Sequence, residues 1–245
     1  MRNIKLTLEY DGTDFHGFQR QRRLRTVQGV LEDSFSRVLG EQIRVIGAGR
    51  TDAGVHALGQ VVNFRTSRPV PMARMAQALN GGLPEDVKVQ GCEEVEEGFH
   101  ARRDARSRVY QYSVVERAMP SPVLGRYALI VREKLALERM AAGARLLVGR
   151  HDFRAFQASG SETKTTERNL LRLECRRAGE RTWITAEADS FLYQMVRNIV
   201  SGLLAVGRGE LAPEALRAAL ETGERPAAAR KPAPACGLCL LEVLY

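Results

Sequence analysis

The segment GAGRTDAGVHA, residues 47–57, contains the carboxylate best placed to do chemistry, Asp52. It lies between two glycine-bearing turns, with Arg50 two residues before it and His56 four residues after it. Glycine adopts backbone conformations that other residues avoid, and it lets a bulky ligand approach closely. We therefore predict that this loop presents Asp52 to a large substrate and that Arg50 contacts the same substrate. The alternative is an ordinary turn, in which Asp is a common residue.

A second candidate is Arg197, the only charged residue between Ser190 and Gly207. Burying an unpaired charge is costly, so we expect Arg197 to pair with a carboxylate from elsewhere in the fold, and Asp52 is the candidate. The alternative places Arg197 on an exposed helical stripe with Tyr193 and Ser201, which lie four residues to either side.

A third candidate is the predicted strand that begins at residue 106. In a strand, alternate residues share one face, here Arg106, Arg108, Tyr110 and Tyr112. Guanidinium groups contact phosphate and tyrosine rings stack on exposed bases, so this face predicts RNA binding. The alternative is a half-exposed strand whose charged groups extend into solvent.

The charge of the chain favours the same kind of partner. The chain has 245 residues, and 37 basic minus 29 acidic residues leave a net charge of +8. A basic surface attracts a polyanion such as nucleic acid, although a compositional bias of the genome also produces arginine-rich proteins. We expect no signal peptide and no membrane span, because no apolar run is long enough.

The four cysteines are scattered and form no disulfide framework, which favours the cytoplasm. Cys236 and Cys239 are three residues apart, but no second pair with zinc spacing accompanies them. We therefore expect these two thiols to be buried and structural, and we expect no bound metal.

Periodicity predicts the order β-α-β-β-α-β twice, as two ferredoxin-like units of an α+β fold with mainly antiparallel sheets. We assign residues 1–104 to an N-terminal unit that carries the Asp52 loop and residues 105–245 to a C-terminal unit that carries Tyr110 and Arg197. If Asp52 and Arg197 pair, the units are joined across a central catalytic cleft.

The first unit is predicted as strand 3–10, helix 26–39, strands 42–48 and 58–66, helix 71–80 and strand 86–95. The second is predicted as strand 106–115, helix 133–148, strands 168–176 and 181–188, helices 191–206 and 213–221, and strand 237–244. Two segments, 157–168 and 223–235, read as loops.

Several motifs in order resemble the tRNA pseudouridine synthase A family over nearly the whole chain. They are YDGTDFHGFQRQ at 10–21, GRTDAGVHA at 49–57, RVYQY at 108–112, GRHDFRAF at 149–156, FLYQMVRNIVSGLL at 191–204 and PAPACGLCL at 232–240. Phe18 stands where this family usually has Trp. Cys236 and Cys239 stand where it often has other residues.

The resemblance implies that Asp52 is the essential aspartate and that Tyr110 stacks on the target base. It also makes Arg197 the basic partner of Asp52, with Gly237 and Leu238 lining the pocket. The implied reaction is isomerisation of uridine to pseudouridine at positions 38, 39 and 40 of the tRNA anticodon stem-loop. A homodimer without cofactor or metal is implied as well.

This reaction breaks the C1′–N1 bond, turns the base and joins C1′ to C5, so no electron carrier is required. Asp52 could attack the sugar or the base, and the sequence leaves this open. A paired target base must first be flipped into a pocket. Two rivals are a non-catalytic RNA-binding protein and a nucleoside glycosidase, which would normally use two carboxylates.

Overall fold

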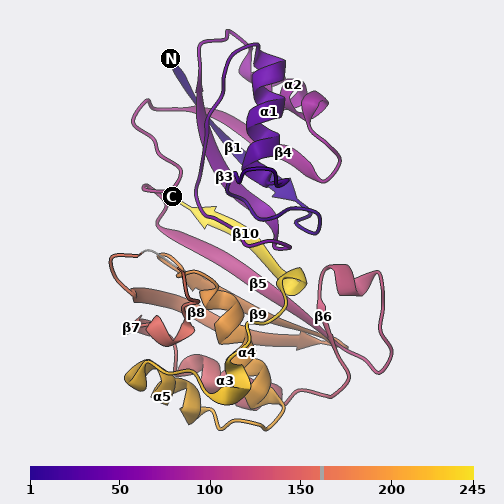
Figure 1. Ribbon diagram of the computed structural model, residues 1–245, viewed down its shortest axis with the longest axis vertical. Helices are drawn as coiled ribbons and strands as arrows, with labels where there is room; N and C mark the ends of the chain where they lie inside the picture. Colours follow the sequence, from indigo (N-terminus) through magenta and orange to yellow (C-terminus); the bar gives the residue numbers. More distant parts are fainter. Residues whose placement is uncertain (161–162) are drawn as a thin grey trace. The chain divides into compact units, whose positions relative to one another are not determined.

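The computed structural model describes residues 1–160 and 163–245, and its internal contacts divide the chain into two units (Figure 1). The first unit comprises Met1–Arg106 together with Cys239–Tyr245, and the second comprises Ser107–Leu238. Both units combine helices with mostly antiparallel strand pairs, which confirms the predicted α+β class.

The C-terminal strand belongs with the first unit, whereas the sequence alone assigns residues 105–245 to one unit. Strand β10 (Leu238–Leu244) pairs in parallel with β3 (His56–Thr66), with Cys239 opposite His56. In Figure 1 the yellow β10 accordingly runs beside the purple strands of the first unit. Strand pairing joins segments far apart in the chain, so periodicity does not reveal it.

In the first unit, the remaining elements follow the predicted order. They are β1 (Arg2–Tyr10), α1 (Val27–Leu39), β2 (Val45–Gly47), β3, α2 (Met72–Gly82) and β4 (Val87–Val95). The strands lie in the order β4-β1-β3-β10, and the short strand β2 pairs with β3 in antiparallel orientation. Strand β1 is antiparallel to both β3 and β4, and α1 packs against α2.

The core of this unit is formed by the residues whose periodic spacing predicted its strands and helices. Alternate residues of β1 are buried, and so is the stripe of α1 that contains Leu31 and Phe35. Thr26 caps the start of α1 by accepting a hydrogen bond from the Gly29 N–H, and Gly40 ends the helix with a φ of 64°. These local signals confirm the predicted helix.

The second unit contains more elements than the sequence predicted. They are β5 (Ser107–Glu116), β6 (Leu129–Val131), α3 (Leu137–Arg145), β7 (Gly149–Asp152), β8 (Glu167–Ala178), β9 (Arg181–Ala188), α4 (Met195–Gly207) and α5 (Glu214–Thr222). The strand order is β5-β9-β8-β7, with β6 parallel to β5. The short strands β6 and β7 were not predicted, because each has too few residues to show a period.

Helix α3 is shorter than the predicted helix 133–148. The backbone N–H of Leu135 donates to the Glu116 carboxylate, and that of Ala136 donates to the Gly207 carbonyl. These tertiary bonds hold the preceding residues in a non-helical path. In the predicted loop 157–168, residues 161 and 162 lie outside the described ranges.

None of the helices within the described ranges has the length and apolar character needed to span a bilayer.

Candidate functional site

The loop that carries Asp52 connects β2 to β3, and buried polar side chains hold its backbone. Gln60 is completely buried, and its Nε2 donates to the Gly49 carbonyl at 3.0 Å. The hydroxyls of Tyr10 and Thr51 are hydrogen-bonded to each other at 2.8 Å. The loop is therefore tied to the sheet on both sides of Arg50.

Asp52 begins a tight turn. The Val55 N–H donates to the Asp52 carbonyl at 3.2 Å, and Gly54 has a φ of 78°, which favours glycine. The Gly54 N–H donates to the Phe15 carbonyl at 3.3 Å. Asp52 is half-buried and Arg50 is exposed. The turn thus holds the half-buried Asp52 on a braced backbone.

A second loop, residues 11–18, packs closely on this turn. The Phe18 N–H donates to the Thr51 carbonyl at 3.0 Å, and Gly17 has a φ of 87°. A Cβ atom on Gly12 would lie 2.0 Å from the Val55 carbonyl oxygen, so only glycine fits there. The sequence marks this segment as a motif. That its glycines allow it to pack against the Asp52 turn is visible only in the structure.

His56 belongs to this support. Its ring is almost completely buried, and its Nδ1 accepts a hydrogen bond from the Gly12 N–H at 3.0 Å. The same Nδ1 lies 3.2 Å from Asp11 Oδ1. We therefore assign His56 a structural role.

In the second unit, Tyr110 lies on β5 and is buried. Its ring meets the ring of Phe191 edge to face, with centroids 5.3 Å apart and planes at 90°. Phe191 comes four residues before the start of α4. The contact therefore positions the Tyr110 ring relative to the segment that leads to Arg197.

Tyr112, on the same strand, packs against Pro234 and Gly237. Its hydroxyl donates to the Pro234 carbonyl at 2.8 Å, and burial raises its pKa. A Cβ atom on Gly237 would lie 2.7 Å from the Tyr112 ring, so the close approach requires glycine. Leu238 is buried at the next position. Of the predicted pocket residues, Gly237 therefore lies in a tightly packed turn, and Leu238 is the buried first residue of β10.

Arg197 lies in the first turn of α4 and is half-buried. Its Nε donates to the Ala233 carbonyl at 2.7 Å, and its own carbonyl accepts from the Ala233 N–H at 3.1 Å. The same segment that packs on Tyr112 therefore orients the guanidinium group. Tyr193, from the alternative stripe, is exposed, and Ser201 is half-buried.

The basic and aromatic face predicted for β5 is not an open surface. Arg108 and Tyr110 are each only 8% exposed, and Tyr112 is fully buried. Arg108 Nη1 donates to the Asp189 carbonyl at 2.7 Å. Arg106 is exposed, but it precedes the strand. The alternative of a half-exposed strand with its charged groups in solvent therefore does not describe this face, because Arg108, Tyr110 and Tyr112 are all buried.

The cysteine pair is half-buried and not fully buried as predicted. Cys236 lies in a short 3₁₀ turn (Ala235–Gly237) and Cys239 lies in β10. Burial raises the pKa of the Cys236 thiol and raises that of Cys239 to about 12, which disfavours the reactive thiolate. Among the described residues, no cluster of His, Cys, Asp and Glu is arranged to hold a metal ion.

Comparison with known proteins gives consistent matches across both units. A family model described as tRNA pseudouridine synthase matches residues 7–104 and 144–245. The tRNA pseudouridine synthase A of Acetivibrio thermocellus is 42% identical over 245 residues, which cover 100% of both chains. The protein of that name from Syntrophomonas wolfei is 43% identical and covers 100% of this chain and 98% of its own. The tRNA pseudouridine synthase A 2 of Clostridium perfringens is 40% identical over 100% of both.

Proposed function

The chain belongs to the tRNA pseudouridine synthase family, and we propose that Asp52 is the residue with which it isomerises uridine in tRNA. The observation that carries this assignment is the braced loop, which holds the half-buried Asp52 within the matched region. A non-catalytic RNA-binding role is not favoured, since the relatives are named as synthases. We further propose that the targets are uridines 38, 39 and 40 of the anticodon stem-loop.

The chemistry requires one bond to break and one to form on the same face of the sugar. The C1′–N1 bond breaks, the base turns, and C1′ joins C5; the C5 proton then leaves and N1 gains a proton. Asp52 can serve as nucleophile, at C1′ or at C6 of the base, or as the group that transfers the proton. One proton is lost and one is gained, so product and substrate have the same composition and the reaction is an isomerisation.

The other proposed residues act on binding and orientation. Tyr110 stacks on the flipped uracil, and Arg197 keeps the aspartate ionised and oriented. Arg50 contacts the substrate, and Gly237 and Leu238 line the pocket. Arg106 and Arg108 are proposed to contact RNA, and for the buried Arg108 this requires contact through a small exposed part of its side chain. We also propose a homodimer that works in the cytoplasm.

The test is incubation of the protein with an unmodified tRNA transcript, followed by mapping of pseudouridine along the RNA. We expect product at positions 38–40 from the wild type and none from Asp52→Asn. Affinity for tRNA should be nearly unchanged, because phosphate contacts dominate binding. Glu85→Gln is a matched control, since it makes the same change at an exposed position of the first unit. Turnover by Asp52→Asn would refute the assignment.

The proposed partnership of Arg197 with Asp52 needs a separate test. We expect Arg197→Met to lower both the activity and the free energy of unfolding. If the two charges are coupled, Arg197→Met combined with Asp52→Ala should be more stable than the sum of the single effects predicts. Additive losses of stability would show that the two residues do not interact.

A further inference from the structure

A loop rich in arginine, residues 19–25, extends from the first unit. We call these residues the arginine loop. Every one of them is exposed, and the sequence QRQRRLR contains four arginines and no acid. Such a concentration of positive charge on one loop is unfavourable unless carboxylates of the protein or a bound anion neutralise it. The structure distinguishes which arginines are neutralised.

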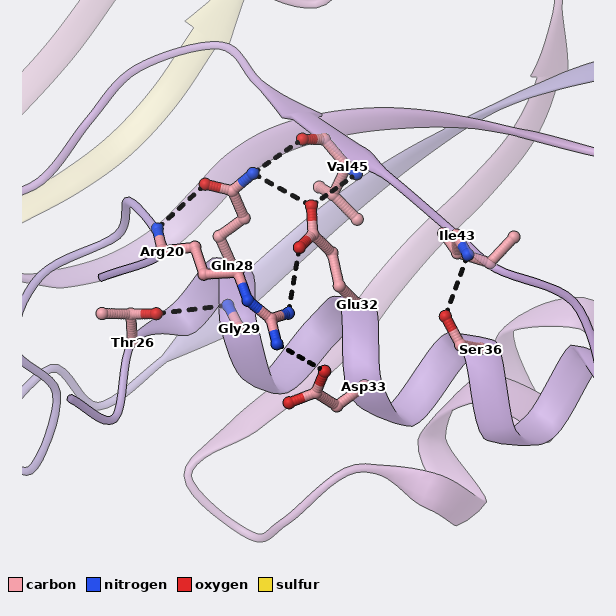
Figure 2. A network of polar contacts seen from close by, with 9 residues as sticks. All are labelled: Arg20, Thr26, Gln28, Gly29, Glu32, Asp33, Ser36, Ile43 and Val45. Carbon is pink, nitrogen blue, oxygen red and sulfur yellow. Dashed lines mark hydrogen bonds and ion pairs between the residues drawn. The ribbon is translucent and has the colours of Figure 1, made fainter. Parts of the chain in front are cut away.

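Arg20 is neutralised by helix α1. Figure 2 shows its guanidinium between two carboxylates, with Nη1 at 3.1 Å from Glu32 and Nη2 at 2.9 Å from Asp33. Its backbone N–H donates to the Gln28 side chain at 3.0 Å, and Gln28 in turn donates to Glu32. Arg20 therefore fastens the first end of the loop to the helix.

Arg25 fastens the other end. Its two terminal nitrogens contact both carboxylate oxygens of Asp86 at 2.7 and 2.8 Å, and its guanidinium lies over the ring of Phe15 at 4.1 Å. Its carbonyl accepts a hydrogen bond from the His16 N–H at 2.8 Å. A bidentate pair combined with stacking fixes a guanidinium more firmly than a single contact does.

Arg22 and Arg23, between these anchors, are not neutralised. Within the described part of the chain, neither forms an ion pair or a side-chain hydrogen bond. Arg23 has a φ of 66°, a left-handed conformation that a residue with a Cβ atom adopts at a cost. The next residue, Leu24, is 43% exposed. The loop thus holds two uncompensated cations outward on a braced backbone.

The arginine loop is coupled to the catalytic loop through its base. The preceding residue, Phe18, donates its N–H to the Thr51 carbonyl, next to Asp52. Gly17 approaches the same carbonyl so closely that a Cβ atom would lie 2.9 Å from its oxygen. The two cations therefore keep a fixed relation to the proposed catalytic residue within one unit.

We propose that Arg22 and Arg23 form a binding site for backbone phosphates of the tRNA substrate. The proposal rests on the proposed function, because it names a contact for the same substrate. Guanidinium groups match phosphate oxygens in geometry and charge. A braced loop loses little conformational entropy when it binds, which favours rigid positioning of the RNA over the Asp52 loop. This site contributes to binding and not to the chemical step.

The experiment measures tRNA affinity against salt concentration, together with steady-state kinetics of pseudouridine formation. For Arg22→Gln with Arg23→Gln we expect KM to rise about tenfold, while kcat stays within about twofold. The slope of log K against log salt should become shallower by about 1.4 to 1.8, the value for two lost phosphate contacts. Arg23→Gly removes one cation and suits the left-handed backbone, so its slope should change by about half as much without a lower Tm.

Arg37→Gln with Arg74→Gln is the matched control, because it removes two exposed charges from helices of the same unit. Its salt slope should remain that of the wild type. Equal slopes for the loop variant and the control would overturn the proposal. A wild-type protein that forms no pseudouridine, while the loop variant still lowers the salt slope for tRNA, would instead refute the proposed function and retain this site.

Discussion

Removing the hydroxyl of Tyr10 tests how the Asp52 loop is held. The Tyr10 hydroxyl is buried, bonds Thr51 at 2.8 Å and accepts from Gln60 at 3.4 Å. In Tyr10→Phe the Thr51 hydroxyl stays buried without this partner, whereas Gln60 keeps its bond to Gly49. We expect the free energy of unfolding at pH 8 to fall by about 1–2 kcal/mol.

Tyr10→Phe should also alter how the free energy of unfolding depends on pH in alkaline solution. Burial raises the pKa of Tyr10 to about 12, against about 10 for an unfolded chain. Because the folded-state pKa is the higher one, this group's contribution to stability is complete below pH 10 and is lost as the pH rises through 12. At pH 11 the wild type has lost about 1.4 kcal/mol from this source, and Tyr10→Phe has lost none of it.

Urea unfolding followed by circular dichroism at pH 8 and pH 11 measures the free energy of unfolding of both proteins at each pH. We expect the stability gap between wild type and Tyr10→Phe to shrink by about 1.4 kcal/mol between these pH values. Thr51→Val should be less costly in the Tyr10→Phe background, by about 1 kcal/mol. Tyr193→Phe, at an exposed tyrosine, should stay within about 0.5 kcal/mol of wild type at pH 8. A gap that does not change with pH would refute the reasoning.

Three further predictions concern the second unit and β10. Gly237→Ala should lower the free energy of unfolding by about 1–3 kcal/mol, because its Cβ atom would lie 2.7 Å from an aromatic ring; Gly98→Ala, with open space around it, should change little in the same urea titration. Cys236→Ser with Cys239→Ser should retain pseudouridine formation, as should treatment with a chelator, and activity restored by added zinc would contradict this. Tyr110→Ala should lower kcat more than tRNA affinity, since one base stack contributes about 1–3 kcal/mol; proportional losses of both would make Tyr110 a general binding residue.

Some features of this protein follow from the sequence alone, because their causes are local. The bounds of α1 follow from the Thr26 cap, the apolar stripe and the Gly40 end. The core face of β1 follows from its alternation. Several short motifs in order, including the one around Asp52, indicate the family, because such a combination is specific even before the contacts of the motifs are known.

Other features depend on tertiary structure, since pairing and burial join residues distant in the chain. Periodicity could not place β10 beside β3, because that pairing depends on hydrogen bonds between distant segments. It could not show that Arg108 is buried, because alternation gives a face but not what covers it. Periodicity also could not show that Arg20 is neutralised and Arg22 is not, although both lie in one run of arginines. Only the folded chain brings Glu32 and Asp33 to Arg20 and leaves Arg22 in solvent.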